Sequence, residues 1–208
     1  MEELQTGDLL LFSEHPHECC MGMLDCCIKL CTGSKYSHAA LIVVDPPWTS
    51  CKGTFVWEST WHGTKDPQDG LIKFGVQLTP IEFYTQRYPG TVSIYVREGT
   101  GLDRQALIDI QKKVYDHKYD TRPKDWCAAL FRRTIPRQTD VFTCSAFVSY
   151  VLTMAGILEE DTLWTTVSAA ELAIEHRDGV IKWKTPYRPV SYIGTYSPTD
   201  THSGYIEI

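Results

Sequence analysis

The sequence predicts an α+β fold in which helices pack on an antiparallel sheet, and three observations support this. Short apolar segments with strand-like patterns follow one another, and segments with helical periodicity separate or follow them. No internal repeat and no convincing boundary divides the 208 residues. An apolar fraction of 43% and six tryptophans are ample for a hydrophobic core. We therefore expect a single domain over residues 1–208.

The expected strands are short apolar segments bounded by turn residues. "GDLLLF" is typical of a turn that leads into a buried strand, and "SHAALIVV" is apolar on both strand faces, as in a central strand. The proline- and tyrosine-rich tail after Val180 is expected to add one or two edge strands. The predicted strands before this tail are 7–12, 37–44, 54–60, 70–78 and 91–98.

The expected helices begin with recognisable N-terminal signals or show an apolar stripe. "TPIE" at 79–82 has the Thr-Pro-x-Glu pattern of a capping box that opens a short helix, and Ser168 with Glu171 forms a second such pattern. Residues 118–140 are expected to be mostly loop, with a short helix at "DWCAALFRR". The remaining predicted helices are 19–31, 102–117 and 168–176.

The segment "DVFTCSAFVSYVLTMAG" predicts a helix that places a cysteine in its first turn. Thr143 is a suitable N-cap, and Gly156 can end the helix in a left-handed conformation. Cys144 begins the apolar stripe of this helix. The partial positive charge of a helix N-terminus favours a thiolate, which is the nucleophilic form of cysteine. The alternative interpretation is a small buried residue at the start of a core helix.

His38 and Glu58 are the candidate partners of this cysteine. His38 opens the doubly apolar strand, where a buried imidazole needs a hydrogen-bond partner. Glu58 lies in the middle of the next strand, where an unpaired carboxylate would be costly. If the two strands are neighbours, the side chains can meet across them. The alternatives are a core histidine bonded to a backbone carbonyl and a carboxylate at the sheet edge facing water.

The order of these motifs resembles the circularly permuted NlpC-type papain-fold hydrolases, in particular their YiiX-like branch. The resemblance covers residues 7–156 and rests on "GDLLLF", "TGSKYSHAALIVV", "FVWEST", "LTPIEFYTQRYPGTVSIYVRE", "KYD" and "FTCSAFVSYVL". It implies a permuted papain-like domain with its core at about 7–156 and a C-terminal extension at 157–208. The histidine strand precedes the cysteine helix, as the permutation requires.

The resemblance also implies roles for individual residues. Cys144 matches the nucleophile, His38 the base and Glu58 the acid that orients the imidazole. Tyr119 in "KYD" matches a tyrosine that lies near the thiolate in related enzymes, where it would contribute to the oxyanion or substrate site. The glycine pair that follows this tyrosine in the family is absent here, where the sequence is "YDTRPKDW".

The expected function is therefore a thiol hydrolase that cleaves an amide (peptide or isopeptide) or ester bond through an acyl-enzyme, without a metal or organic cofactor. Its partner is a peptide or acyl-bearing substrate. One alternative is an acyltransferase or phospholipase acting on lipids, as in the lecithin–retinol acyltransferase-like branch. The other is a non-enzymatic structural or binding protein, for example in a virion, that retains the fold.

Composition limits the partners and the location. The net charge of −6 and the lack of a long basic run argue against nucleic acid. The sequence lacks a signal peptide, a membrane-spanning run and any asparagine, hence any N-glycosylation acceptor, so we expect a cytoplasmic protein. A virion location and peripheral membrane contact remain open.

Two further features are expected to be structural. The cluster "HPHECCMGMLDCCIKLC" has the wrong spacing for zinc, so a helix that lines the core or a groove is favoured over metal binding or palmitoylation. The aromatic residues of the tail, Tyr187, Tyr192 and Tyr196, are expected to form a packed surface strap.

Overall fold

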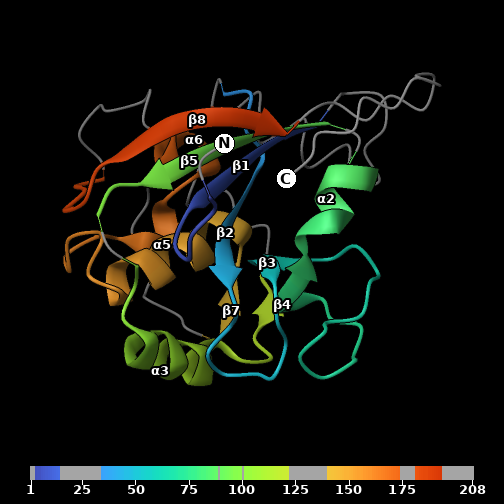
Figure 1. The fold of residues 1–208 in the computed structure, drawn as a ribbon. Coiled ribbons are helices and arrows are strands. Elements are labelled where there is room, and N and C mark those ends of the chain that lie inside the picture. Colours follow the sequence, from blue (N-terminus) through green and yellow to red (C-terminus); the bar gives the residue numbers. More distant parts are fainter. Residues whose placement is uncertain are drawn as a thin grey trace.

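The computed structural model describes residues 3–14, 34–88, 90–99, 101–121, 140–173 and 181–193. It is an α+β structure with one open, mostly antiparallel sheet (Figure 1). The strands are β1 (Leu9–Glu14), β2 (His38–Val44), β3 (Thr54–Thr60), β4 (Gly75–Pro80), β5 (Gly90–Arg97), β6 (Lys118–Tyr119), β7 (Val141–Phe142) and β8 (Tyr187–Ile193). The helices are α2 (Ile81–Arg87), α3 (Arg104–Val114), α5 (Cys144–Met154) and α6 (Ala169–Leu172), with a 3₁₀ turn, η1 (Trp164–Thr166).

Within the described residues, the sheet has eight strands in the order β7-β6-β4-β3-β2-β1-β5-β8. The prediction of a central strand is confirmed, because β2 lies between β1 and β3 and is buried on both faces. The sheet is mostly antiparallel, as predicted, but β6 and β7 run parallel. These two-residue strands pair Tyr119 with Phe142, so the chain leaves both strands at the same end of the sheet.

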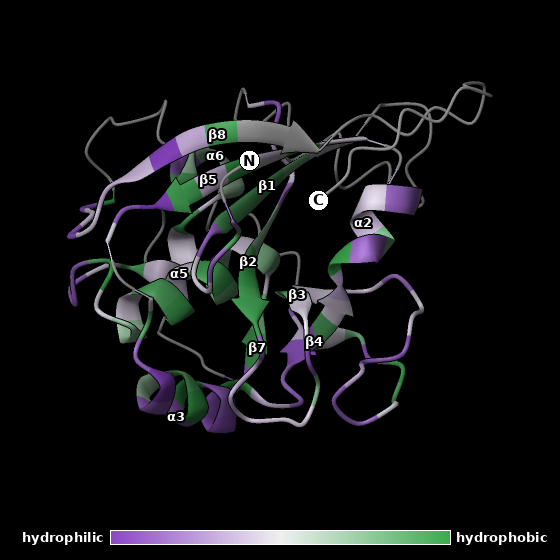
Figure 2. Cartoon of the chain, viewed as in Figure 1, coloured by the Kyte–Doolittle hydropathy of each residue, from purple (hydrophilic) through white to green (hydrophobic). Residues whose placement is uncertain are grey.

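Two hydrophobic clusters cover the two faces of the sheet. Alternate residues of β2 divide between them: Leu41 and Val43 face the larger cluster, and Ala40 and Ile42 face the smaller one. Helices α5 and α3 pack in the larger cluster, whereas α2 packs in the smaller one, on the other side of the sheet (Figure 1). Figure 2 shows that apolar residues concentrate on β1, β2 and α5, the elements at the centre of the molecule.

Helix α5 has the ends that the sequence predicts. The Thr143 hydroxyl accepts a hydrogen bond from the Ala146 N–H at 3.4 Å, and Gly156 has a φ of 74° just beyond the helix. Its residues from Cys144 to Thr153 are all buried, since the helix packs over β2 and β3 and against η1 and α6. The second predicted capping box is also present, with Ser168 and Glu171 bonding reciprocally at the start of α6.

The capping box predicted at 79–82 is wrong. Strand β4 continues through Thr79 to Pro80, and Pro80 precedes α2 without any side-chain cap. The Thr79 hydroxyl donates instead to a carboxylate oxygen of Glu58, at 2.7 Å. The strand predicted at 70–78 begins only at Gly75, and of the preceding residues Ile72 forms an isolated bridge with Lys65.

Helix α3 and the C-terminal tail follow the predictions, and the loop predicted at 118–140 includes one short strand. The helix predicted at 102–117 is α3, and the tail supplies the edge strand β8. Tyr187 of this strand is buried and its hydroxyl donates to the Gly7 carbonyl at 2.7 Å, as expected for a packed strap. The loop predicted at 118–140 contributes β6 to the sheet. The predicted helices at 19–31 and "DWCAALFRR", and the residues of 168–176 after 173, lie outside the described residues.

Gly75 provides a test of the β4–β6 junction. Its φ is 151°, and a Cβ at this position would clash with the backbone carbonyl of His117. We expect Gly75→Ala to lower the free energy of unfolding by about 2 kcal/mol or more in urea denaturation, since backbone must move. The control Gly70→Ala has a φ of 74° but open space around the new methyl group. It should cost only about 1 kcal/mol, and equal costs would contradict the close approach.

Candidate active site

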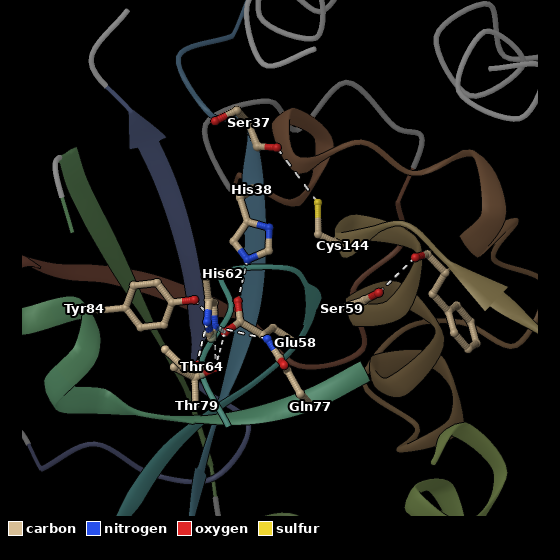
Figure 3. A network of polar contacts seen from close by, with 11 residues as sticks. Ser37, His38, Glu58, Ser59, His62, Thr64, Gln77, Thr79, Tyr84 and Cys144 are labelled. Atoms are coloured by element: carbon tan, nitrogen blue, oxygen red, sulfur yellow. Dashed lines mark hydrogen bonds and ion pairs between the residues drawn. The ribbon is translucent and has the colours of Figure 1, made fainter. Parts of the chain in front are cut away.

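The candidate site lies where several chain segments reach the same end of the sheet. His38 is the first residue of β2, and the antiparallel β3 ends beside it at Thr60. The Ser59 hydroxyl donates to the carbonyl of Phe142 at 2.9 Å, which ties β3 to the last residue of β7. Thr143 then leads directly into α5, so that Cys144 arrives beside His38 (Figure 3).

Cys144 is buried at the N-terminus of α5 and is held among polar groups. Its sulfur lies 3.9 Å from the carbonyl oxygen of Ser37, the residue before His38. Burial raises the pKa of the Cys144 thiol, but the His38 imidazolium and the backbone N–H groups of Ala39 and Ser145 outweigh it, so the pKa is lowered. The site therefore favours the thiolate, which is the reactive form.

His38 connects the thiol to a carboxylate. Its Nε2 lies 2.7 Å from Oε2 of Glu58, while the other ring nitrogen faces Cys144 (Figure 3). Phe12 packs against the ring, with centroids 4.9 Å apart. Burial lowers the pKa of His38, but the Cys144 thiolate and the Glu58 carboxylate raise it to about 10. The histidine is therefore protonated at neutral pH and forms an ion pair with the cysteine.

Glu58 is fully buried and is bonded at both oxygens. Besides His38 at Oε2, Oε1 accepts hydrogen bonds from the hydroxyls of Thr79 at 2.7 Å and Tyr84 at 2.5 Å. Oε1 also lies 3.5 Å from Nε2 of His62. Burial raises the pKa of Glu58, but the bonds from His38 and His62 lower it to about 2. The carboxylate stays ionised wherever the protein is folded above that pH.

His62 also belongs to this site, although the sequence patterns did not predict it. It lies 2.9 Å from the Thr79 hydroxyl and 2.7 Å from the Thr64 hydroxyl, and its ring stacks on Phe83. Its position four residues after Glu58 was the available signal. Tyr84 carried no such signal, because its contact depends on how α2 folds back over the sheet.

Tyr119 lies close to the site along the backbone. It ends β6 and is paired with Phe142, two residues before Cys144. Its ring stacks on Phe74, with centroids 5.3 Å apart. The structure therefore brings Cys144, His38 and Glu58 into one network and sets Tyr119 on the strand next to β7. A role of Tyr119 toward the oxyanion or the substrate stays a prediction.

The described part of the chain holds neither a cluster of metal ligands nor a membrane-spanning helix. Within the described ranges, no three His, Cys, Asp or Glu side chains are grouped so that they could hold a metal ion. The cysteine-rich segment at 15–31 lies outside those ranges. None of the helices in the described part of the chain is long and apolar enough to cross a membrane.

Comparison with known proteins adds no assignment. No protein-family model matches the chain, and no curated protein sequence matches it.

The ion pair predicts an unusual pH dependence of thiol reactivity. Because the pKa of Cys144 is lowered, iodoacetamide at about pH 6 should alkylate Cys144 at least about tenfold faster than Cys51. Labelling should persist above pH 10, since loss of the His38 proton leaves a thiolate. Peptide mapping by mass spectrometry measures both rates. Cys51 is a suitable control because it is a free, partly buried cysteine bonded to Thr49. Equal rates would contradict the ion pair.

Substitutions of Glu58 and of its neighbour His62 should slow the alkylation of Cys144 to different extents. Glu58→Gln removes the negative charge beside His38, so the imidazole pKa should fall and alkylation at about pH 6 should slow about tenfold or more. His62→Gln keeps hydrogen-bonding groups near Oε1 and should slow it only about two- to threefold. Thermal unfolding monitors the fold of each variant. An unchanged rate in Glu58→Gln would show that another group holds His38.

Proposed function

We propose that the protein is a thiol hydrolase with a circularly permuted papain-like fold, which cleaves an amide (peptide or isopeptide) or ester bond. The observation that carries this proposal is the bonded series of Cys144, His38 and Glu58, with the cysteine at a helix N-terminus. A nucleophile, a base and a group that orients the base are the three parts that covalent acyl transfer requires. We assign these roles to Cys144, His38 and Glu58 respectively.

The chain order supports the permuted form of this fold. The histidine strand β2 lies near the N-terminus, and the cysteine helix α5 comes after β7. The histidine therefore precedes the cysteine in the sequence. The same catalytic arrangement occurs in unrelated enzymes with different residue orders, so the order does not weaken the assignment. The motifs from "GDLLLF" to "FTCSAFVSYVL" carry the family resemblance.

The first half-reaction forms an acyl-enzyme. The Cys144 thiolate attacks the carbonyl carbon, a carbon–sulfur bond forms, and the carbonyl electrons move onto oxygen. The backbone N–H of Cys144, at the N-terminus of α5, is available to stabilise this oxyanion. When the tetrahedral intermediate collapses, the bond to the leaving group breaks. His38 gives its proton to the leaving amine or alcohol.

The second half-reaction releases the acyl group. His38, now neutral, accepts a proton from water, and the hydroxide equivalent attacks the thioester carbonyl. Collapse of this intermediate expels the thiolate and restores the ion pair. Glu58 stays ionised throughout, because its hydrogen bonds hold its pKa at about 2. It keeps the imidazole oriented while His38 gains and loses its proton.

The proposal predicts peptide cleavage that depends on Cys144. Purified protein incubated with a peptide library should release cleaved peptides, detected by mass spectrometry, and Cys144→Ala should abolish them. Cys51→Ala, a change at a cysteine outside the network, should retain them. Turnover should fall as the pH rises through about 10, because His38 then lacks the proton it must donate.

A parallel incubation with short-chain phospholipid distinguishes the alternatives. Release of fatty acid, or transfer of the acyl chain to an amine, without peptide cleavage would favour the lipid-directed branch. No product from either substrate, together with an unreactive Cys144, would contradict the enzymatic proposal and favour a structural role.

A further inference from the structure

Exposed apolar side chains gather in the connection between β3 and β4. Among the described residues, seven large hydrophobic side chains are exposed. Four of them lie in this connection: Trp61, Leu71, Ile72 and Phe74. Trp61 is 54% exposed and Phe74 is 41% exposed. Scattered apolar residues need no explanation on a protein surface, but a concentration in one segment does.

Three aromatic rings in this region form a continuous series, which we call the aromatic row: Trp61, Phe74 and Tyr119. Trp61 meets Phe74 edge-on at a centroid distance of 6.3 Å. Phe74 stacks on Tyr119 at 5.3 Å with an interplanar angle of 14°. The row thus combines residues from the ends of three chain segments into one aromatic surface.

The aromatic row lies at the same end of the sheet as the candidate site. Trp61 follows the last residue of β3, Phe74 precedes the first residue of β4, and Tyr119 ends β6 beside Phe142. Neighbouring strands are about 4.8 Å apart and consecutive Cα atoms are 3.8 Å apart at most, so the Cα of Tyr119 lies within about 12 Å of that of Cys144. In an extended peptide this distance spans about three residues.

The segment that carries Trp61 and Phe74 is fixed by buried ionic contacts. The Lys73 ammonium lies 2.8 Å from Asp66 and 2.5 Å from Asp69, and it also lies over the Tyr115 ring. Tyr115 donates to Asp69 at 2.8 Å, directly after α3. Lys73 and Asp66 are buried, so these contacts hold the segment in one conformation and preorganise the exposed rings.

We propose that the aromatic row is a subsite for an aromatic side chain of a peptide substrate, one to three residues from the scissile bond. This inference rests on the proposed function. An aromatic ring can stack on or pack edge-on against the row with little loss of conformational freedom. The row is only three rings long, and the exposed residue Lys118 directly precedes Tyr119, so this surface suits a peptide side chain better than a long alkyl chain.

The test compares two peptide-like probes that alkylate Cys144 without turnover. The sulfur of Cys144 displaces chloride from chloroacetyl-phenylalanine amide or from chloroacetyl-alanine amide, and peptide mapping gives each rate. We expect the phenylalanine probe to react about tenfold faster in the wild type. In Trp61→Ser and Phe74→Ser this ratio should fall to about two or less. Iodoacetamide labelling should stay within about twofold of wild type, because the thiol itself is unchanged.

Leu163→Ser is the matched control, since Leu163 is an exposed apolar residue beyond the C-terminal end of α5 and should leave the ratio intact. Equal rates for the two probes in a wild type that reacts with iodoacetamide would overturn the subsite while the proposed function stands. A faster reaction with chloroacetyl octylamide than with the phenylalanine probe would overturn it in favour of an alkyl chain. Failure of Cys144 to react with any reagent would remove the proposed function and the subsite together.

Discussion

The buried carboxylate of Glu58 is the constraint on which the arrangement of the site depends. An ionised carboxylate removed from water costs several kcal/mol unless its oxygens are bonded. The donors come from separate elements: His38 from β2, Thr79 from β4, Tyr84 from α2 and His62 from the segment after β3. Because all these donors must reach the same carboxylate, Glu58 fixes the position of α2 relative to β2, β3 and β4.

His38 matters because it joins the two faces of the sheet. Glu58 and Tyr84 belong to the face covered by α2, since their neighbours Val56 and Ile81 pack there. Cys144 belongs to α5, which packs on the other face. A side chain in the middle of a strand points to one face only, so it could not contact both Glu58 and Cys144. The first residue of a central strand can, since its ring sits at the end where the two faces meet (Figure 3).

The sequence predicted what depends on local patterns, and it failed where tertiary contacts override them. The strands β2 and β3, the capped start of α5 and the meeting of His38 with Glu58 followed from apolar periodicity and from the cost of burying polar groups. The pattern at 79–82 failed because β4 continues to Pro80, which leaves Thr79 one residue before the N-cap of α2, where its hydroxyl bonds the buried carboxylate. His62 and Tyr84 reach Glu58 only because the chain turns back toward it after β3 and after β4, and no short-range sequence pattern predicts those turns.

The described residues include two buried ionic clusters, one around Lys73 and one around Glu58, and they differ in the chemistry of their anions. Lys73 lies between two aspartates and over an aromatic ring, so one ammonium group bridges two carboxylates in that cluster. These contacts hold the chain in place. In the cluster around Glu58 a cation again lies between two anions, but the second anion is the Cys144 thiolate rather than a carboxylate. A thiolate is a nucleophile that can form a bond to a carbonyl carbon, so the cluster around Glu58 is able to react. The cluster around Lys73 contains no such nucleophile.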